Sequence, residues 1–196
     1  MKTNPNNVFS SNPLNILISI LLFCAIDTMM AQNVTLIRNT CKSSSKNNPN
    51  VNVNFCITSL QSAPASRCAA LRGLEIIAIR LLRYNVTDTR CFIKQLVTTK
   101  NWNQFYKNRL NDCYELYSDA IPSVKKAMQS FSGKLYDDAN IQISAVMDAA
   151  TTCEDGFKEG GNEALSSPLK KRNDDMFQLG AIALSFLGIL QAGSSN

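Results

Sequence analysis

The chain has 196 residues, of which 20 are Lys or Arg, 15 are Asp or Glu and seven are Cys, and it contains no histidine. The missing histidine removes the commonest general base, the usual catalytic partner of Ser or Cys, and the commonest metal ligand. A glycine-rich phosphate loop is also absent from the sequence. The composition therefore disfavours an enzyme, and we predict no catalytic residue, no metal site and no cofactor.

The first 31 residues have the pattern of a secretory signal peptide. Lys2 is the only charge before Asp27, an apolar run of 13 residues covers Leu14–Ile26, and the small Ala31 precedes a polar stretch. A membrane-spanning helix needs about 20 apolar residues, so an uncleaved anchor is the weaker alternative. We predict cleavage after Ala31, export from the cell and no membrane attachment of the mature protein. In a secreted protein, the net charge of +5 favours polyanionic surroundings or an acidic partner over nucleic acid.

Residues 32–64 have the pattern of a short helical hairpin, with arms at about 34–43 and 51–60 and a polar bend between them. Cys41 and Cys56 each lie seven residues from the central pair Asn48-Pro49. On antiparallel helices such positions lie at the same height, as the Cα separation of a disulfide, about 4.4–6.8 Å, requires. We therefore predict a Cys41–Cys56 disulfide and an oxidising compartment.

Two Asn-x-Thr tripeptides begin at Asn33 and Asn85. In a secreted chain both asparagines are candidates for N-glycosylation. Such tripeptides also occur by chance, so the sequence leaves open whether either residue is modified.

Residues 65–196 are expected to form a four-helix bundle, whose first helix runs from about residue 66 to 98. Its first half is apolar on nearly all sides and is expected to be buried all round, while the polar stretch 85–90 is a candidate kink. Cys68 and Cys91 lie 23 residues apart on this helix, which places their Cα atoms about 35 Å apart at a rise of 1.5 Å per residue. We predict that these two thiols do not pair with each other and are free or form intermolecular links.

The second and third bundle helices show apolar residues at alternating spacings of three and four, the pattern of one buried helix face. Cys113 and Cys153 lie 18 and 17 residues from the turn between them, at about 131–136, so the same height argument predicts a Cys113–Cys153 disulfide. Pro122 predicts a bend in the second helix, and Gly160-Gly161 is expected to end the third. The residues with this spacing are Leu110, Cys113, Tyr117, Ala120, Val124, Ala127 and Phe131, followed by Tyr136, Ala139, Ile143, Val146, Ala150, Cys153 and Phe157.

The fourth helix is expected to begin with Ser167 as its N-cap and Pro168 in its first turn. Its apolar stretch 177–190 resembles the tail of a lipid-anchor signal, but such tails normally end apolar, whereas this chain ends in polar residues. We therefore predict that the helix packs into the core. The fold class is all-α: an up-down-up-down four-helix bundle preceded by a helical hairpin and stapled by disulfides.

Asp112, Glu115 and Asp119 recur on one face of the second bundle helix. They form either an acidic site or, as the pattern favours, a solvated helix face. A lipid carrier is a further alternative, but it would need a hollow core, and large residues such as Tyr117 and Phe186 occupy the predicted core positions.

Three groups of motifs resemble those of a known family. They are Phe55-Cys56 with Ser59-Leu60, the run 113–120 that begins Cys-Tyr-Glu, and the run 152–157 that reads Thr-Cys-Glu-Asp-Gly-Phe. Together they resemble the plant cell-wall and vacuolar inhibitors of invertase and pectin methylesterase, and the run 152–159 is most similar to pollen-allergen members described as invertase inhibitors. The resemblance covers essentially the whole mature sequence.

The resemblance implies the same fold, the same two disulfides, and a monomer that blocks a cell-wall enzyme's substrate cleft one to one, without catalysis. It also implies a location in the apoplast or cell wall, or in the vacuole. Invertase inhibitors of the family insert a Pro-Lys-Phe segment at the turn that here contains Lys134, Leu135 and Tyr136. The proline is absent here, and Gly133-x-x-Tyr136-Asp137 is nearer to the methylesterase-inhibitor pattern. We therefore narrowly favour pectin methylesterase as the target, with acid invertase as the alternative and a non-inhibitory secreted bundle as the alternative of another class.

Overall fold

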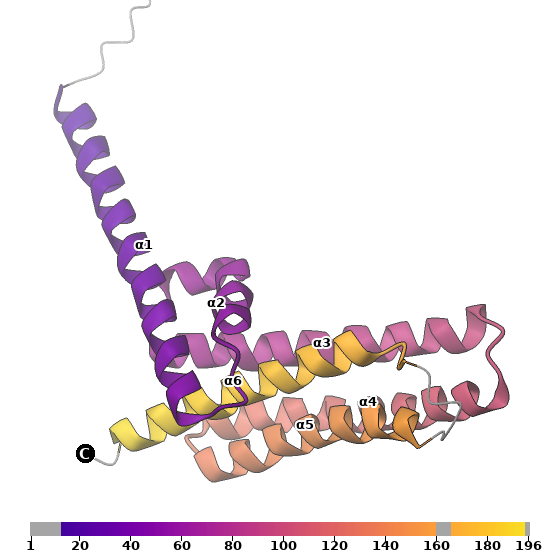
Figure 1. Ribbon diagram of the computed structural model, residues 1–196. Helices are drawn as coiled ribbons and strands as arrows, with labels where there is room; N and C mark the ends of the chain where they lie inside the picture. The colour runs from indigo at the N-terminus through magenta and orange to yellow at the C-terminus, as the bar shows by residue number, and fades with distance from the viewer. Residues whose placement is uncertain (1–12, 160–165, 195–196) are drawn as a thin grey trace, which may run out of the picture.

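The computed structural model describes residues 13–159 and 166–194, and these residues form helices joined by short connections, with no strand among them. The elements in chain order are α1 (Pro13–Asn47), α2 (Val53–Ser62), the 3₁₀ helix η1 (Pro64–Cys68), α3 (Leu71–Thr99), α4 (Gln104–Ser132), α5 (Tyr136–Lys158) and α6 (Lys170–Ser194). Helices α3 to α6 run side by side as a bundle, and α2 with the end of α1 lies against one end of it (Figure 1). The all-α fold, with a hairpin before a four-helix bundle, is confirmed.

The alternating spacing correctly identified the bundle core. Every residue of the pattern on α4 is buried, and on α5 only Tyr136 is half-buried rather than buried. Helix α6 contributes Met176, Leu179, Ala183 and Phe186 to the same core. Among the described residues, 170–193 form one helix that is long and apolar enough to cross a membrane. Core helices of globular proteins pass the same test, and α6 packs against both α3 and α5.

Both predicted cysteine pairs are disulfides in the structure. Cys41 and Cys56 join α1 to α2 with Cα atoms 5.8 Å apart, and Cys113 and Cys153 join α4 to α5 with Cα atoms 5.0 Å apart. All four cysteines are almost completely buried. The disulfides therefore lie inside the two hairpins.

The start of α3 differs from the prediction of one helix beginning near Ser66. Pro64 starts the short η1 helix, and Ala69 and Ala70 then adopt extended conformations before α3 begins. A Cβ atom on Gly73 would lie 3.0 Å from that of Ala69, so glycine permits this close return of the chain. Cys68 and Cys91 thus lie on different elements, and the helix-length argument does not apply to them, although both are free and exposed.

Three smaller predictions about the helices were also wrong or fall outside the described residues. Helix α3 continues without interruption through 85–90, because Val86 and Thr89 are buried there and Arg90 bonds to α4. Helix α6 begins at Lys170, and the Ser167 side chain accepts a hydrogen bond from the Leu169 amide in the preceding turn. Gly160-Gly161 lies outside the described residues.

The N-terminal hairpin also has different bounds from those expected. Helix α1 is continuous across the expected cleavage point after Ala31, and its first part extends away from the bundle (Figure 1). Its end at Asn47 lies four residues beyond the predicted arm. Helix α2 begins at Val53, where the Asn52 side chain accepts a hydrogen bond from the Phe55 amide and caps the helix.

Candidate target-binding surface on the α4–α5 hairpin

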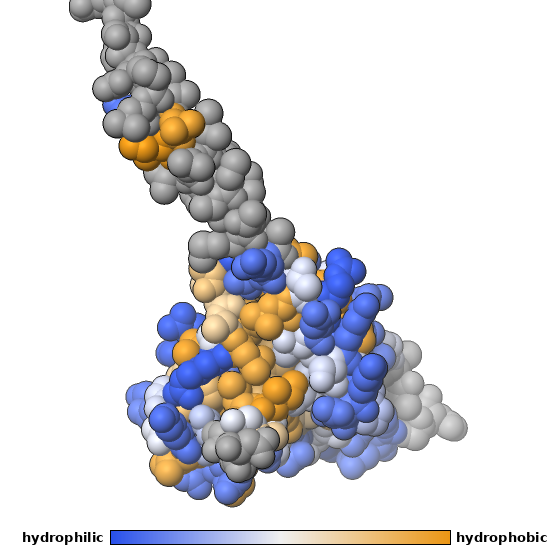
Figure 2. Space-filling model, turned by 90° about the vertical axis from the view of Figure 1, so that its left-hand side faces the viewer, coloured by the Kyte–Doolittle hydropathy of each residue, from blue (hydrophilic) through white to orange (hydrophobic). Residues whose placement is uncertain are grey.

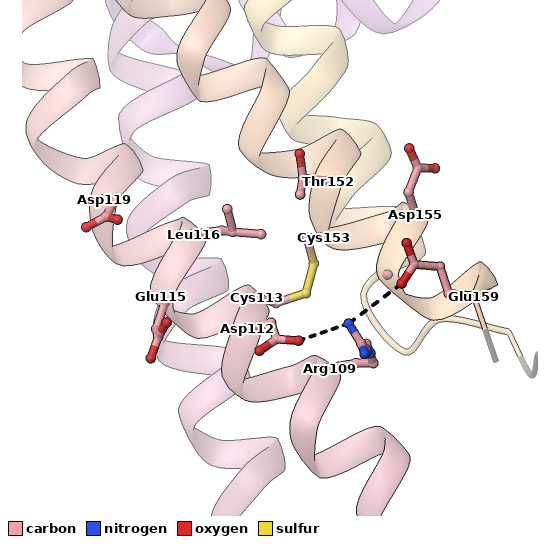
Figure 3. A pocket seen from close by; sticks show the side chains of 11 residues that line it. Arg109, Asp112, Cys113, Glu115, Leu116, Asp119, Thr152, Cys153, Asp155 and Glu159 are labelled. Atoms are coloured by element: carbon pink, nitrogen blue, oxygen red, sulfur yellow. Dashed lines mark hydrogen bonds and ion pairs between the residues drawn. A yellow bond between two sulfur atoms is a disulfide. The ribbon is translucent and has the colours of Figure 1, made fainter.

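A groove lies between α4 and α5, directly over their disulfide. It encloses about 500 Å³, with Cys113 and Cys153 in its floor and Leu116 and Thr152 on its walls. Figure 3 shows these side chains between the two helices, with charged groups around them. Because a disulfide ties α4 to α5 at this level, the groove has a defined width.

Carboxylates from two helices line this groove. The three acidic residues predicted from the sequence, Asp112, Glu115 and Asp119, lie on α4, and the fold adds Asp155 from α5 and Glu159, the residue that directly follows α5. The sequence pattern did not indicate Asp155 and Glu159 as part of a site. Asp155 and Glu159 lie two and six residues after Cys153, so the predicted disulfide fixes their height near Cys113 but not the side of the hairpin on which they lie.

Arg109 is the one cation among the residues that line the groove. Its guanidinium lies 3.1 Å from the Asp112 carboxylate and 3.9 Å from that of Glu159, so it bridges α4 and the end of α5 (Figure 3). Gly156 leaves room for Arg109, because a Cβ atom at position 156 would lie only 3.4 Å from the Arg109 side chain. These ion pairs are largely exposed and contribute little stability, so their main effect is to set the charge pattern of the groove, which remains acidic.

A buried polar network connects α4, α5 and α6. The Tyr117 hydroxyl donates a 2.7 Å hydrogen bond to Asn173 Oδ1, and Asn173 Nδ2 donates a 2.7 Å bond to Glu154. Asn173 Nδ2 also approaches Cys153 Sγ at 3.5 Å. Burial raises the pKa of Tyr117 well above its ordinary value, so the phenol stays protonated and serves as a donor. The network holds α6 against the α4–α5 hairpin.

The turn between α4 and α5 has a left-handed residue at Lys134, with φ of 61°. The Lys134 amide donates to Phe131 O and the Leu135 amide donates to Ser130 O, which satisfies the last carbonyls of α4. Leu135 is 57% exposed and Lys134 is exposed. Of the three turn residues predicted to contact a target, these two therefore project into solvent.

Tyr136 is held within the turn. Its ring packs against that of Phe131 with centroids 6.0 Å apart, and its hydroxyl accepts a hydrogen bond from Arg72 of α3. The Arg72 guanidinium also lies 4.5 Å above the Phe131 ring and donates to the Phe131 carbonyl. Arg72 is a contact that sequence reasoning missed. It donates one hydrogen bond to Tyr136 and makes two interactions with Phe131, and so holds this ring pair at the end of α4.

The end of the molecule that contains this turn also carries apolar surface. Figure 2 views this end and shows a hydrophobic band between hydrophilic margins. A second groove of about 540 Å³ lies between the end of α1 and α6. Leu184 and Ile189 of α6 are among the residues that line it. This groove is separate from the acidic one, since no residue lines both.

The two predicted glycosylation sites have different surroundings. Asn33 Nδ2, the atom that would carry a glycan, donates a hydrogen bond to the Ala69 carbonyl. Asn85 is half-buried on α3, with its Oδ1 atom buried and unbonded. Glycosylation of either residue remains a prediction.

The described residues contain no group of three or more Cys, Asp or Glu side chains arranged to hold a metal ion. The features that the fold does assemble are an acidic groove, a hydrogen-bonded turn and an apolar end. The fold defines a class of protein: a four-helix bundle that is preceded by a helical hairpin and stapled by two disulfides.

Comparison with known proteins identifies the family within this class. The model of the plant invertase/pectin methylesterase inhibitor family matches residues 35–186, and the chain belongs to this family. The chain is 40% identical to the "Putative invertase inhibitor" of Platanus orientalis over 157 residues, which cover 80% of this chain and 91% of that protein.

Two further relatives carry the name of the other target. The "Pectinesterase inhibitor" of Actinidia deliciosa is 35% identical over 107 residues, covering 55% of this chain and 57% of that protein. A crystal structure of a mutant pectin methylesterase inhibitor from Arabidopsis matches with a TM-score of 0.62 at 22% identity, covering 70% of this chain and 89% of that one. Members of the family are thus enzyme inhibitors, and the relatives are named for two different target enzymes.

Proposed function

We propose that this protein is a secreted inhibitor that blocks the substrate cleft of a plant cell-wall enzyme one to one, with pectin methylesterase as the favoured target. The mature protein would begin after Ala31 and act as a monomer in the apoplast or cell wall, or in the vacuole. The proposal draws on the family and on the acidic groove between α4 and α5.

The observation that carries the choice of target is the placement of five carboxylates, from α4 and from the end of α5, around one groove that a disulfide spans. Pectin becomes anionic as its methyl esters are hydrolysed, so an enzyme cleft that holds it must accommodate negative charge. An acidic inhibitor surface is electrostatically complementary to such a cleft. Sucrose is uncharged and places no comparable demand on an invertase pocket.

The α4–α5 turn supports the same choice. An inhibitor that inserts an aromatic side chain into a sucrose pocket needs that side chain free, whereas Tyr136 packs on Phe131 and is bonded to Arg72. To enter a pocket, Tyr136 would first have to give up both contacts.

Acid invertase is the second candidate target, because the relative at 40% identity is named an invertase inhibitor. In this case Leu135 and Tyr136 would contact the enzyme. Tyr136→Ala would then weaken binding by at least about 2 kcal/mol, as expected for an aromatic anchor at an interface.

The test is titration of the purified protein against one pectin methylesterase and one acid invertase at mildly acidic pH. We expect inhibition of the methylesterase, weakened about tenfold by Glu115→Lys with Asp119→Lys, because each reversal places a cation in the groove facing the enzyme. Asp148→Lys with Asp174→Lys changes the net charge equally outside the groove and is the matched control. Equal effects of the two double variants would exclude the groove as the contact surface. Failure to inhibit either enzyme would reject the inhibitor function.

A further inference from the structure

The charges of the chain are divided unequally between its two halves. Residues 32–100 contain ten Lys and Arg but only two Asp and Glu, whereas residues 101–196 contain nine Lys and Arg and twelve Asp and Glu. The two acids of the first half do not balance its cations. Glu75 is fully buried, and Asp88 is paired with Arg172 of α6. The excess positive charge therefore lies on the surface formed by the first half.

Part of this charge forms a row along α3. Arg80, Arg83 and Lys94 are all exposed, and their spacings of 3 and 11 residues place them on one face of the helix. At 1.5 Å per residue, the row from Arg80 to Lys94 is about 21 Å long. The fully exposed positions between these cations are neutral, and the one acid in this stretch, Asp88, is paired with Arg172 of α6.

The cations of this row have no ionic partners among the described residues. Every ion pair found there takes its cation from the second half of the chain, from Arg109, Lys158, Lys170, Lys171 or Arg172. The positive potential of the α3 row is thus not neutralised within the protein and is available to an anionic partner.

An exposed aromatic side chain lies within the same row. Tyr84 is 70% exposed, more than the other large apolar or aromatic side chains found on the described surface. It follows Arg83 and lies one helical turn beyond Arg80, so its ring stands among the cations. A phenol ring can stack on the C–H face of a sugar ring, and the flanking cations would bind carboxylates attached to that sugar.

We propose that the exposed face of α3, formed by Arg80, Arg83, Tyr84 and Lys94, binds a linear polysaccharide that carries carboxylates on its sugar rings. The extended row suits an extended polymer with charges spread along it. A membrane surface is a poorer fit. An interfacial helix needs several large apolar side chains on one face, whereas Tyr84 is the one large aromatic or apolar side chain exposed on this face of α3. Helices α4 and α6 lie between α3 and α5 in the bundle (Figure 1), so the bound polymer would leave the α5 side of the acidic groove open.

The experiment measures binding of the mature, disulfide-bonded protein to immobilised polygalacturonate at low salt. We expect binding that weakens as salt rises, and no binding to the fully methyl-esterified polymer, which lacks the charges. The triple variant Arg80→Gln, Arg83→Gln and Lys94→Gln should lose at least about tenfold in affinity, as expected when three anion contacts are removed. A matched control, Lys125→Gln, Lys126→Gln and Lys171→Gln, removes the same charge from exposed positions on α4 and α6 and should bind nearly as the unmodified protein does.

Tyr84→Ala tests the sugar contact separately. It should weaken binding to polygalacturonate several-fold but leave unchanged the binding to poly-L-glutamate, a carboxylated polymer without sugar rings. Equal losses in the two triple variants, an equal effect of Tyr84→Ala on both polymers, or tighter binding to anionic lipid vesicles or DNA would overturn the proposal. Because no enzyme is present in these measurements, their outcome is independent of whether the protein inhibits either target.

Discussion

The protein contains two helical hairpins with buried disulfides, and the two are stabilised in different ways. In the N-terminal hairpin, α2 has 10 residues and buries only Cys56 and Leu60. In the bundle hairpin, α4 has 29 residues and buries eight side chains, among them Tyr117 and Phe131. The apolar area buried by the second hairpin is therefore much larger, and burial of apolar area is the main favourable term in folding. The comparison indicates that the disulfide is essential to keep the short hairpin folded, whereas in the long hairpin it reinforces a packed core.

Removal of each disulfide tests this comparison and should have the largest effects. By loop-closure entropy, Cys113→Ala with Cys153→Ala should cost about 4 kcal/mol and Cys41→Ala with Cys56→Ala about 3 kcal/mol, since the closed loops span 40 and 15 residues. The first loss should appear in the urea unfolding of the whole bundle. The second should appear mainly as faster amide hydrogen exchange within residues 34–62. Uniformly faster exchange in both double variants would contradict the comparison.

The buried polar network of the bundle hairpin should contribute the next largest effect. Asn173→Ala removes the acceptor of the Tyr117 hydroxyl and the donor to Glu154, and it should lower the free energy of unfolding by about 2–3 kcal/mol, since both groups lose a partner in a buried site. Asn108→Ala, at an exposed position on α4, is the control and should change little. A loss below about 0.5 kcal/mol for Asn173→Ala would mean that water replaces the missing contacts.

Glu75, near the start of α3, provides the contrast to this hydrogen-bonded network. Its carboxyl is fully buried and neither oxygen has a hydrogen-bond partner, and this burial raises its pKa well above the ordinary value of 4.5. The folded state keeps a proton that the unfolded state releases above that value. Stability from this group is therefore complete below the ordinary pKa and falls as pH rises toward the raised one.

Glu75→Leu should remove that pH dependence. We expect the variant to be more stable at neutral pH by about 1–2 kcal/mol, because it replaces an unsatisfied buried acid with an apolar side chain. Urea unfolding at several pH values measures both effects. Equal stability of the unmodified protein from mildly acidic to neutral pH would contradict this prediction. It would mean that the Glu75 carboxyl is solvated or hydrogen-bonded.

The smallest expected effect is at the α4–α5 turn. Lys134 adopts the left-handed conformation, whereas the neighbouring Gly133 has φ of −78°. Lys134→Gly should stabilise the protein by about 0.5–1 kcal/mol, because glycine adopts this conformation without steric cost. Gly133→Ala should be nearly neutral, since its new Cβ would make ordinary contacts at 3.6 Å. Thermal unfolding would show whether the two substitutions rank in this order.

Features that depend on local periodicity were predictable from the sequence. Residues such as Leu110, Val124 and Ile143 are buried as their spacing required, because a helix repeats its faces every 3.6 residues whatever it packs against. The positions of Cys113 and Cys153 about one turn likewise indicated which residues lie at the same height. The absence of histidine and the presence of the family motifs are also properties of the sequence alone.

Contacts between elements distant in the sequence were decided by the tertiary structure. The rotation of each helix about its axis, and the chain return after η1, depend on how side chains from several elements pack together. Only that packing brings Asp155 beside the acidic residues of α4, places Arg72 over the α4–α5 turn, joins Tyr117 to Asn173 and buries Glu75. The sequence by itself therefore determined the four bundle helices apart from their ends, their buried faces and the cysteine pairs, whereas the packing of those faces decided which charges meet and which residue holds Tyr136 in place.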